Sequence, residues 1–269
     1  MRHPFFAIPC PIAIGHRGSA GEAPENTLAS FERALAEGAA ILESDVHLTR
    51  DGVPVLLHDD AVDRVTEGSG AVREMALAEL RALDAGFRFS PDGGRTHPFR
   101  GCGLRIPTLA EALAAFPEAR FNLELKEDLP GSVERTLEVV RAGGREELTL
   151  LTAAEDALMS RLRRAVVHSR CEIAIGASTG DVLDFVRSAV SGERPRQGPM
   201  ALQIPAEFAG RPLATRELVA HAHAHGVQVH VWTVNDPAEM ARLLDLGVDG
   251  IVSDHPSRVV ELCRSRASG

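Results

Sequence analysis

Acidic side chains at a regular spacing follow two apolar runs of the sequence. Glu43 and Asp45 in "ILESDV" are two residues apart, and Glu124 and Lys126 in "FNLELKED" repeat this spacing. Residues two apart on a strand point to the same face. Carboxylate oxygens from neighbouring strands suit a hard cation such as Mg²⁺ or Ca²⁺. Glu43, Asp45 and Glu124 are therefore candidate ligands of one divalent cation; the alternative is that some of them are exposed or paired with Arg and Lys.

Histidine and basic side chains accompany these acids. His16 and Arg17 follow the apolar run "IAIG", and His58 ends "VPVLLH". A histidine titrates near neutral pH, so this pair could serve as acid and base. Arg17 can hold a phosphate or carboxylate through its planar guanidinium, and Lys126 adds a second positive charge. The residue types indicate an anionic substrate, although the sequence alone cannot place His58 within reach of His16.

Strand-like and helix-like stretches alternate along nearly the whole chain, as in βα units around a parallel sheet. The predicted strands are Ile12 to Gly15, Ala39 to Val46, Ala119 to Lys126, Leu148 to Thr152, Cys171 to Gly176, Met200 to Ile204, Val227 to Val234 and Gly250 to Ser253. The predicted helices are Asn26 to Glu37, Thr108 to Ala115, Val133 to Ala142, Ala154 to Val167, Asp181 to Val190, Thr215 to His225, Pro237 to Leu246 and Ser257 to Arg264. Strands that are each followed by a helix predict a (β/α)8 barrel, in which catalytic groups lie at the C-terminal ends of the strands.

One strand-like run does not fit this alternation. Val53 to Asp59 is separated from the second strand only by "TRDG", whereas a parallel crossover needs about a dozen residues. The run must therefore return as an antiparallel hairpin partner. We assign it, with a short helix near Ala76 to Leu83, to an insertion over residues 47–105 that covers the C-terminal mouth. Residues 1–269 are expected to form a single barrel domain with this insertion inside it.

Composition excludes several classes of protein. The 29 Lys and Arg residues against 38 Asp and Glu residues give a net charge of −9, which disfavours nucleic acid or an anionic membrane surface as the partner. No apolar run approaches the roughly 20 residues that span a bilayer. The cysteines are far apart and form no CxxC pair, so neither a zinc knuckle nor a disulfide framework is expected. We expect a soluble cytoplasmic protein with a small-molecule substrate; a homodimer is possible.

Seven motifs stand in the order found in the glycerophosphodiester phosphodiesterases, which the sequence resembles from Gly15 to about Pro256. They are "GHRG", "PENT", "ESDVHLTRDGVPVLLHD", "IPTLAEAL", "LELK", "VHVWTVND" and "GVDGIVSDHP". The combination is far more specific than any one piece. The resemblance implies a (β/α)8 barrel with an insertion after the second strand. It also implies metal-dependent hydrolysis of glycerophosphodiesters to sn-glycerol 3-phosphate and an alcohol.

The resemblance also implies a role for each candidate residue. His16 and His58 match the family's acid-base histidines. Its divalent-metal ligands are matched by Glu43, Asp45 and Glu124. Arg17 and Lys126 match the phosphate-binding groups, and Trp232 matches an aromatic residue that lines the pocket. Asn26 in "PENT" also matches, but we favour it as the N-cap of the following helix. Gly18 is expected to let the backbone turn away from the first strand. Ser44 replaces the usual apolar residue and should face away from Glu43 and Asp45.

Three other functions stay open at this point. The first is hydrolysis of lysophospholipids by the same family machinery, which requires an apolar channel. The second is a catalytically inactive barrel that binds glycerophosphate ligands, and the third is a barrel metalloenzyme acting on a sugar or carbonyl substrate. His221 and His225 have helical metal-site spacing, but we favour an exposed helix face. His47, His97 and His230 carry no assignment.

Overall fold

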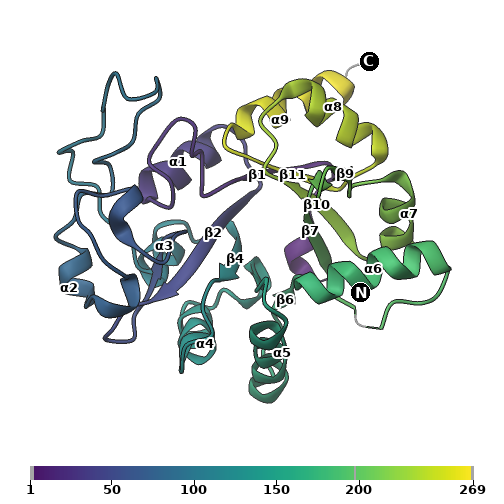
Figure 1. Cartoon of the computed structure of the whole chain (residues 1–269), viewed down its shortest axis with the longest axis horizontal. Coiled ribbons are helices and arrows are strands. Elements are labelled where there is room, and N and C mark those ends of the chain that lie inside the picture. Colours follow the sequence, from purple (N-terminus) through teal and green to yellow (C-terminus); the bar gives the residue numbers. More distant parts are fainter. Residues whose placement is uncertain (1–2, 197, 268–269) are drawn as a thin grey trace.

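Eight parallel strands form a nearly closed barrel with helices around it in the computed structural model, which describes residues 3–196 and 198–267 (Figure 1). The barrel strands are β1 (Ile12–Gly15), β2 (Ile41–Leu48), β4 (Arg120–Leu125), β5 (Thr149–Thr152), β6 (Ala174–Ile175), β7 (Ala201–Pro205), β10 (Gln228–Trp232) and β11 (Gly250–Ser253). Their order in the sheet is β6-β5-β4-β2-β1-β11-β10-β7. The predicted (β/α)8 barrel is confirmed.

The outer helices follow the barrel strands as predicted, with ends that differ by a few residues. They are α1 (Leu28–Ala36), α3 (Leu109–Ala115), α4 (Ser132–Ala142), α5 (Asp156–Ser169), α6 (Thr179–Ser191), α7 (Arg216–Ala224), α8 (Pro237–Leu246) and α9 (Pro256–Ala267). Local chemistry sets where they begin. At α3, Thr108 Oγ1 accepts the Glu111 N–H at 3.1 Å, and Glu111 Oε2 accepts the Thr108 N–H at 2.9 Å. Such a reciprocal cap satisfies donors that the first helical turn leaves free.

Apolar side chains close the N-terminal end of the barrel. A short 3-10 helix, η1 (Pro4–Phe6), contributes the buried Phe5 and Phe6 to a cluster with residues of β1, β2, β5, β6, β7 and β11. Other apolar clusters pack the helices onto the outside of the strands; for example, Phe31 of α1 meets Phe121 of β4 edge to face with ring centroids 5.6 Å apart. Because the N-terminal end is filled with apolar groups, polar chemistry is left to the C-terminal end.

The barrel is weakest between β6 and β7. Neither strand pairs with the other in the sheet, and β6 is two residues long, shorter than the predicted Cys171 to Gly176. A backbone hydrogen bond from the Met200 N–H to the Ile175 carbonyl at 2.8 Å joins the two sides. This seam lies opposite β1 and β2, which stand in the middle of the strand order.

Between β2 and α3 the chain makes the predicted hairpin. β3 (Pro54–Leu56) pairs antiparallel with β2, with Leu56 opposite Val46. Two 3-10 turns, η2 (Val62–Arg64) and η3 (Val72–Glu74), and the one-turn helix α2 (Leu77–Leu80) follow. These elements share a small apolar core made of Val55, Leu57, Val62, Val72, Leu80, Ala85 and Ile106. The segment therefore packs as a unit beside the barrel (Figure 1).

A second small hairpin was not predicted. After β7, β8 (Glu207–Phe208) pairs antiparallel with β9 (Arg211–Pro212). It follows the C-terminal end of a barrel strand, so it lies at the mouth, and Phe208 is 67% exposed there. Within residues 3–196 and 198–267, no helix is long and apolar enough to cross a membrane.

Candidate active site

The end of β1 turns sharply and presents His16 and Arg17 at the mouth. Arg17 has a φ of 50° and Gly18 a φ of 88°. A Cβ at Gly18 would lie 2.3 Å from Ser30 Oγ, so the position excludes any side chain. This confirms the expected turn at Gly18. The turn aims the Arg17 backbone N–H at Glu43 Oε2, which accepts it at 2.9 Å.

The predicted metal-ligand carboxylates lie on adjacent strands. Asp45 of β2 is directly paired with Glu124 of β4 in the parallel register. The Lys126 ammonium lies between them, with Nζ 3.3 Å from Asp45 Oδ1 and 3.2 Å from Glu124 Oε2. Burial alone would lower the pKa of Lys126, but the charges of Asp45 and Glu124 raise it. Lys126 therefore stays a cation next to the acids.

The pKa of Glu43 shows that the nearby cations do not fully offset the negative charge of this cluster. Burial and the neighbouring charge of Asp45 raise the pKa of Glu43 to about 7, because two carboxylates sharing a partly enclosed site repel each other. A divalent cation beside Glu43 and Asp45 would relieve that repulsion, and the all-oxygen donor set fits a hard ion. The three carboxylates do not yet converge, however. Among the described residues, the group whose ligand atoms all lie within 4.8 Å of one another is His47, Asp60 and Glu127.

Each predicted catalytic histidine has a carboxylate on Nδ1. His16 Nδ1 lies 2.7 Å from Asp254 Oδ1, directly after β11, and His58 Nδ1 lies 2.6 Å from Asp59 Oδ1. A carboxylate on one ring nitrogen fixes the tautomer and leaves Nε2 for proton transfer. Burial acts to lower the pKa of His16, but the hydrogen bond to Asp254 and the charge of Glu43 raise it overall.

A chain of charges connects His58 to Arg17. Asp59 Oδ2 accepts from Arg64 Nε at 2.6 Å, which lowers the pKa of Asp59 to about 2. Glu25 joins two arginines: its Oε2 lies 2.6 Å from Arg64 Nη1, and its Oε1 lies 2.8 Å from Arg17 Nη1. Burial would raise the pKa of Glu25, but these two guanidiniums lower it. His58 and Arg17 are thus held in one network that spans the insertion and the barrel.

Asn26 is not the helix cap that we predicted. The N-cap of α1 is Thr27, whose Oγ1 accepts the Ser30 N–H at 3.2 Å. Asn26 instead has a φ of 57°, donates from Nδ2 to Asp45 Oδ2 at 3.1 Å and accepts the Ser44 hydroxyl at 2.6 Å. Ser44 therefore holds Asn26, which in turn contacts Asp45, one of the predicted metal ligands.

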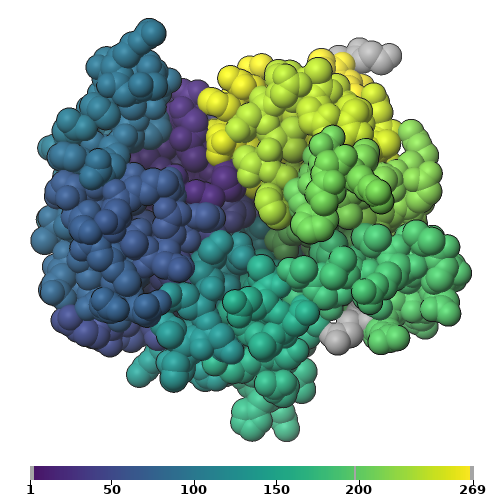
Figure 2. Space-filling model, viewed as in Figure 1, coloured from purple at the N-terminus to yellow at the C-terminus, as the bar shows by residue number. Residues whose placement is uncertain are grey.

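The remaining predicted substrate-binding residue lies at the mouth. Trp232 is the last residue of β10, pairs in register with Pro205 of β7, and is 44% exposed. The β8–β9 hairpin begins two residues after Pro205 and carries the exposed Phe208. Figure 2 shows a hollow between the blue surface of the insertion and the green to yellow C-terminal half.

Four other histidines make structural contacts. His221 Nε2 lies 2.8 Å from Ser188 Oγ, and His225 Nδ1 lies 2.9 Å from the His221 carbonyl, so these two pack on α6 and the α7 backbone. His97 Nδ1 lies 3.0 Å from the Phe89 carbonyl within the insertion. His230 Nε2 lies 3.0 Å from Gln228 Oε1 inside the barrel. His47 alone belongs to the ligand group described above.

Sequence reasoning did not single out Asp254, Glu25 or Arg64. Asp254 belongs to the motif "GVDGIVSDHP" and Glu25 to "PENT", so their places in these motifs were the signal that could have identified them. Arg64 lies in no motif that we identified. Asn235 was also missed: it donates from Nδ2 to Asp254 Oδ2 at 2.5 Å and holds the carboxylate that holds His16.

Comparison with known proteins shows the family of this chain. The glycerophosphoryl diester phosphodiesterase family model matches residues 16–258. A glycerophosphodiester phosphodiesterase of Caldanaerobacter subterraneus subsp. tengcongensis is 30% identical over 258 residues, which cover 94% of this chain and 98% of that protein. A rat protein named lysophospholipase D GDPD1 is 28% identical over 95% of this chain and 87% of its own length.

A solved structure is similar over almost the whole chain. An Oleispira antarctica phosphodiesterase in complex with the product sn-glycerol-3-phosphate matches with a TM-score of 0.76 and 29% identity, covering 97% of this chain and 98% of that one. The barrel, its mouth and these matches define a phosphodiester hydrolase. The chain belongs to the glycerophosphoryl diester phosphodiesterase family, as the sequence motifs implied.

Proposed function

We propose that the protein hydrolyses glycerophosphodiesters to sn-glycerol 3-phosphate and an alcohol by acid-base catalysis with His16 and His58, aided by one divalent cation, Mg²⁺ or Ca²⁺. The observation that carries this proposal is the matched environment of the two histidines. Each binds a carboxylate through Nδ1, at 2.7 Å for His16 and 2.6 Å for His58, so each can present Nε2 to the substrate.

The substrate phosphate would lie between basic groups. Arg17 offers its guanidinium and Lys126 its ammonium, and both form ion pairs with carboxylates that orient them. Trp232 covers the glycerol moiety with its indole face. A cation held by Glu43, Asp45 and Glu124 would offset the charge on the phosphoryl oxygens. Its binding requires Lys126 to give up its contact with Asp45 or Glu124.

The proton transfers then follow from the two histidines. One Nε2 takes the proton from the glycerol 2-hydroxyl as that oxygen attacks phosphorus, and the other Nε2 gives a proton to the departing alcohol oxygen. The product of this step is a cyclic phosphate. Water opens it with the two histidines in exchanged roles, which yields glycerol 3-phosphate. An internal nucleophile avoids the entropy cost of positioning a water molecule in the first step.

The test is release of glycerol 3-phosphate from glycerophosphoethanolamine and glycerophosphocholine by chelator-stripped protein supplied with Mg²⁺, Ca²⁺ or no metal. We expect release only with metal, and none from His58→Ala under any condition. If glycerol 3-phosphate is released equally well with and without metal, the reaction does not need a cation. No release from either substrate by the native sequence would remove the proposed substrate class.

Lysophospholipids are the second candidate substrate, because a relative that is 28% identical is named lysophospholipase D. Phe208 of β8 and Trp232 at the end of β10 are both exposed at the mouth and could contact an acyl chain. Turnover of lysophosphatidylcholine that falls in Phe208→Ser, with glycerophosphocholine turnover unchanged, would support it. Neither an inactive barrel nor a sugar-directed metalloenzyme accounts for the paired histidines. A single catalytic domain over residues 1–269, a cytoplasmic location and a homodimer stay predictions.

A further inference from the structure

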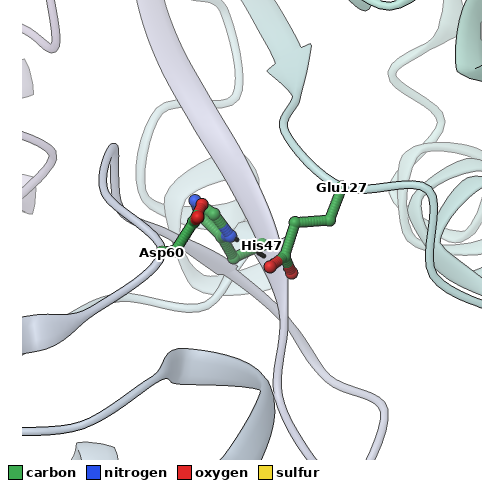
Figure 3. Close-up of side chains that lie close together, drawn as sticks. All are labelled: His47, Asp60 and Glu127. Atoms are coloured by element: carbon green, nitrogen blue, oxygen red, sulfur yellow. Dashed lines mark ion pairs between the residues drawn. The ribbon is translucent and has the colours of Figure 1, made fainter.

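Beneath the His58 loop lies a second group of possible metal ligands, which the proposed reaction does not use. His47 is on β2, Asp60 follows β3 and Glu127 follows β4 (Figure 3). Ligand atoms of these three side chains all lie within 4.8 Å of one another. They come from three different segments of the fold, each of which also carries residues of the candidate active site.

The geometry of His47 leaves two acceptors facing each other. Its Nε2 lies 3.1 Å from the His58 carbonyl oxygen, which can only accept, so Nε2 carries the hydrogen. In a neutral ring, Nδ1 is then a lone pair, and it points at Glu127 Oε2, 3.4 Å away. Within the described part of the chain, neither atom has a hydrogen-bond partner, and the His47 side chain is fully buried. Facing acceptors of this kind call for a positive charge between them.

The distance between His47 Nδ1 and Glu127 Oε2 suits a bound ion. Bonds of about 2.1 Å from one tetrahedral Zn²⁺ place two ligand atoms about 3.4 Å apart, which equals the His47 to Glu127 separation. A cavity of about 10 Å³, lined in part by His47, Glu127, Ser132 and Thr136, adjoins the pair. Asp60 is exposed and gives the group an open side toward solvent. An ion can therefore enter, and water can complete its coordination.

The surrounding charges are compatible with a cation. The charges of the two carboxylates balance that of a divalent ion. Arg73 Nη1 is 3.7 Å from the other oxygen of Glu127, but its side chain is 50% exposed, so water screens its charge. One imidazole among the ligands favours a transition metal over Mg²⁺ or Ca²⁺.

We propose that His47 Nδ1, Glu127 and Asp60 bind a divalent transition metal ion, Zn²⁺ by preference, at a structural site separate from the catalytic cation. The ion ties β2, the loop that carries His58 and the loop that follows Lys126. Since His47 Nε2 holds the His58 backbone, metal binding positions His58 without contacting substrate. This inference stands on its own and does not require the proposed substrate.

The test uses full-length protein that is stripped with chelator, incubated with Zn²⁺, passed over a desalting column and analysed for metal by mass spectrometry. Glu127→Gln and Asp60→Asn should each lose one equivalent of Zn²⁺ or bind it at least tenfold more weakly. Asp128→Asn is the matched control, because it removes the same charge at a neighbouring surface carboxylate that pairs with Arg161. It should retain the ion.

Asp45→Asn separates the two sites, because it removes a proposed ligand of the catalytic cation. It should keep the Zn²⁺ equivalent that Glu127→Gln loses. Co²⁺ in place of Zn²⁺ should give the visible absorption of a site with low coordination number, and Asp60→Asn should abolish it. Asp60 is exposed, so this variant is expected to fold even if Glu127→Gln does not.

Three outcomes overturn the proposal. The unaltered protein retains no Zn²⁺, in which case a proton or a water molecule lies between His47 and Glu127. Glu127→Gln and Asp60→Asn retain as much Zn²⁺ as the unaltered protein. Finally, Asp45→Asn loses the ion as completely as Glu127→Gln does, which would assign it to the catalytic carboxylates.

Discussion

His16 Nδ1 and Asp254 Oδ1 lie 2.7 Å apart although 238 positions separate them in the sequence. They directly follow β1 and β11, which are neighbouring strands with Gly15 opposite Ser253. The carboxylate is itself held by Asn235. His16 thus receives its orientation from the last βα unit of the barrel.

Asp254→Asn should lower kcat by about 100-fold or more, since it removes the charge that orients His16 and supports its protonated form. The same charge raises the pKa of His16, so its loss should move the His16 limb of the pH-rate profile to lower pH. The measurement is kcat/KM against pH with glycerophosphoethanolamine. Asp245→Asn, at an exposed carboxylate that pairs with Arg266, is the control and should leave the profile unchanged.

His16→Ala and His58→Ala should each reduce turnover by about 1,000-fold or more, because each removes one partner of the acid-base pair. His58 is about one third exposed, so its loss should barely change stability. Circular dichroism and the melting temperature check the fold, and product release checks activity. His97→Ala removes a histidine that contacts the insertion backbone and should stay active. Near-normal turnover in either active-site variant would exclude that histidine from the mechanism.

Asp45→Asn should weaken activation by Mg²⁺ or Ca²⁺ by at least about tenfold, with partial rescue at high metal concentration. Ser44→Ala should have a smaller effect in the same direction, because it releases Asn26 from one of its two contacts near Asp45. The measurement is initial rate against metal concentration for chelator-stripped protein. An unchanged metal dependence in Asp45→Asn would contradict the proposed ligand set.

Glu25→Gln should raise KM and also change the pH dependence of stability. Because Arg64 and Arg17 lower its pKa in the folded protein from the ordinary 4.5, ionised Glu25 stabilises the fold above about pH 4.5. This contribution is lost as the pH falls through the lowered pKa. We expect Glu25→Gln to cost about 1–3 kcal/mol at pH 7, with a difference in melting temperature that shrinks toward pH 3.

Glu22→Gln is the matched control for Glu25→Gln. Glu22 is a nearby acid whose partner is His255, and it lies outside the network of Arg17 and Arg64. Its variant should show the unaltered KM. A melting difference for Glu25→Gln that stays constant from pH 7 to pH 3 would refute the ionic role.

The barrel could be predicted because strand-like and helix-like stretches alternate along the sequence. A connection between parallel strands also needs about a dozen residues, which excluded the short run after the second strand from the barrel. The hairpin of β2 and β3 followed from the same argument. The β8–β9 hairpin could not be predicted, since "EFAGRP" forms only two residues of strand on each side and Ala209 adopts a φ of 50° that its residue type does not signal.

The site could not be predicted where it depends on backbone conformation or on contacts between residues far apart in the sequence. Asn26 resembles an N-cap by type and position, but its left-handed backbone redirects the amide to Asp45. Arg64 becomes significant only after the insertion packs against the barrel and brings it to Glu25. The positions of the candidate acids and histidines at strand ends could be read from the sequence, but their partners depend on tertiary structure.

The seam between β6 and β7 places the part of the barrel that opens most easily away from the strands that carry the candidate site. It stands opposite β1 and β2, the strands that hold His16, Arg17, Glu43 and Asp45. Local opening there breaks few hydrogen bonds and leaves those strands paired on both sides. Amide protons beside the seam should exchange with solvent sooner than those of β1 and β2. The same seam is where the fold can best accept a new terminus or an inserted segment without disturbing catalysis.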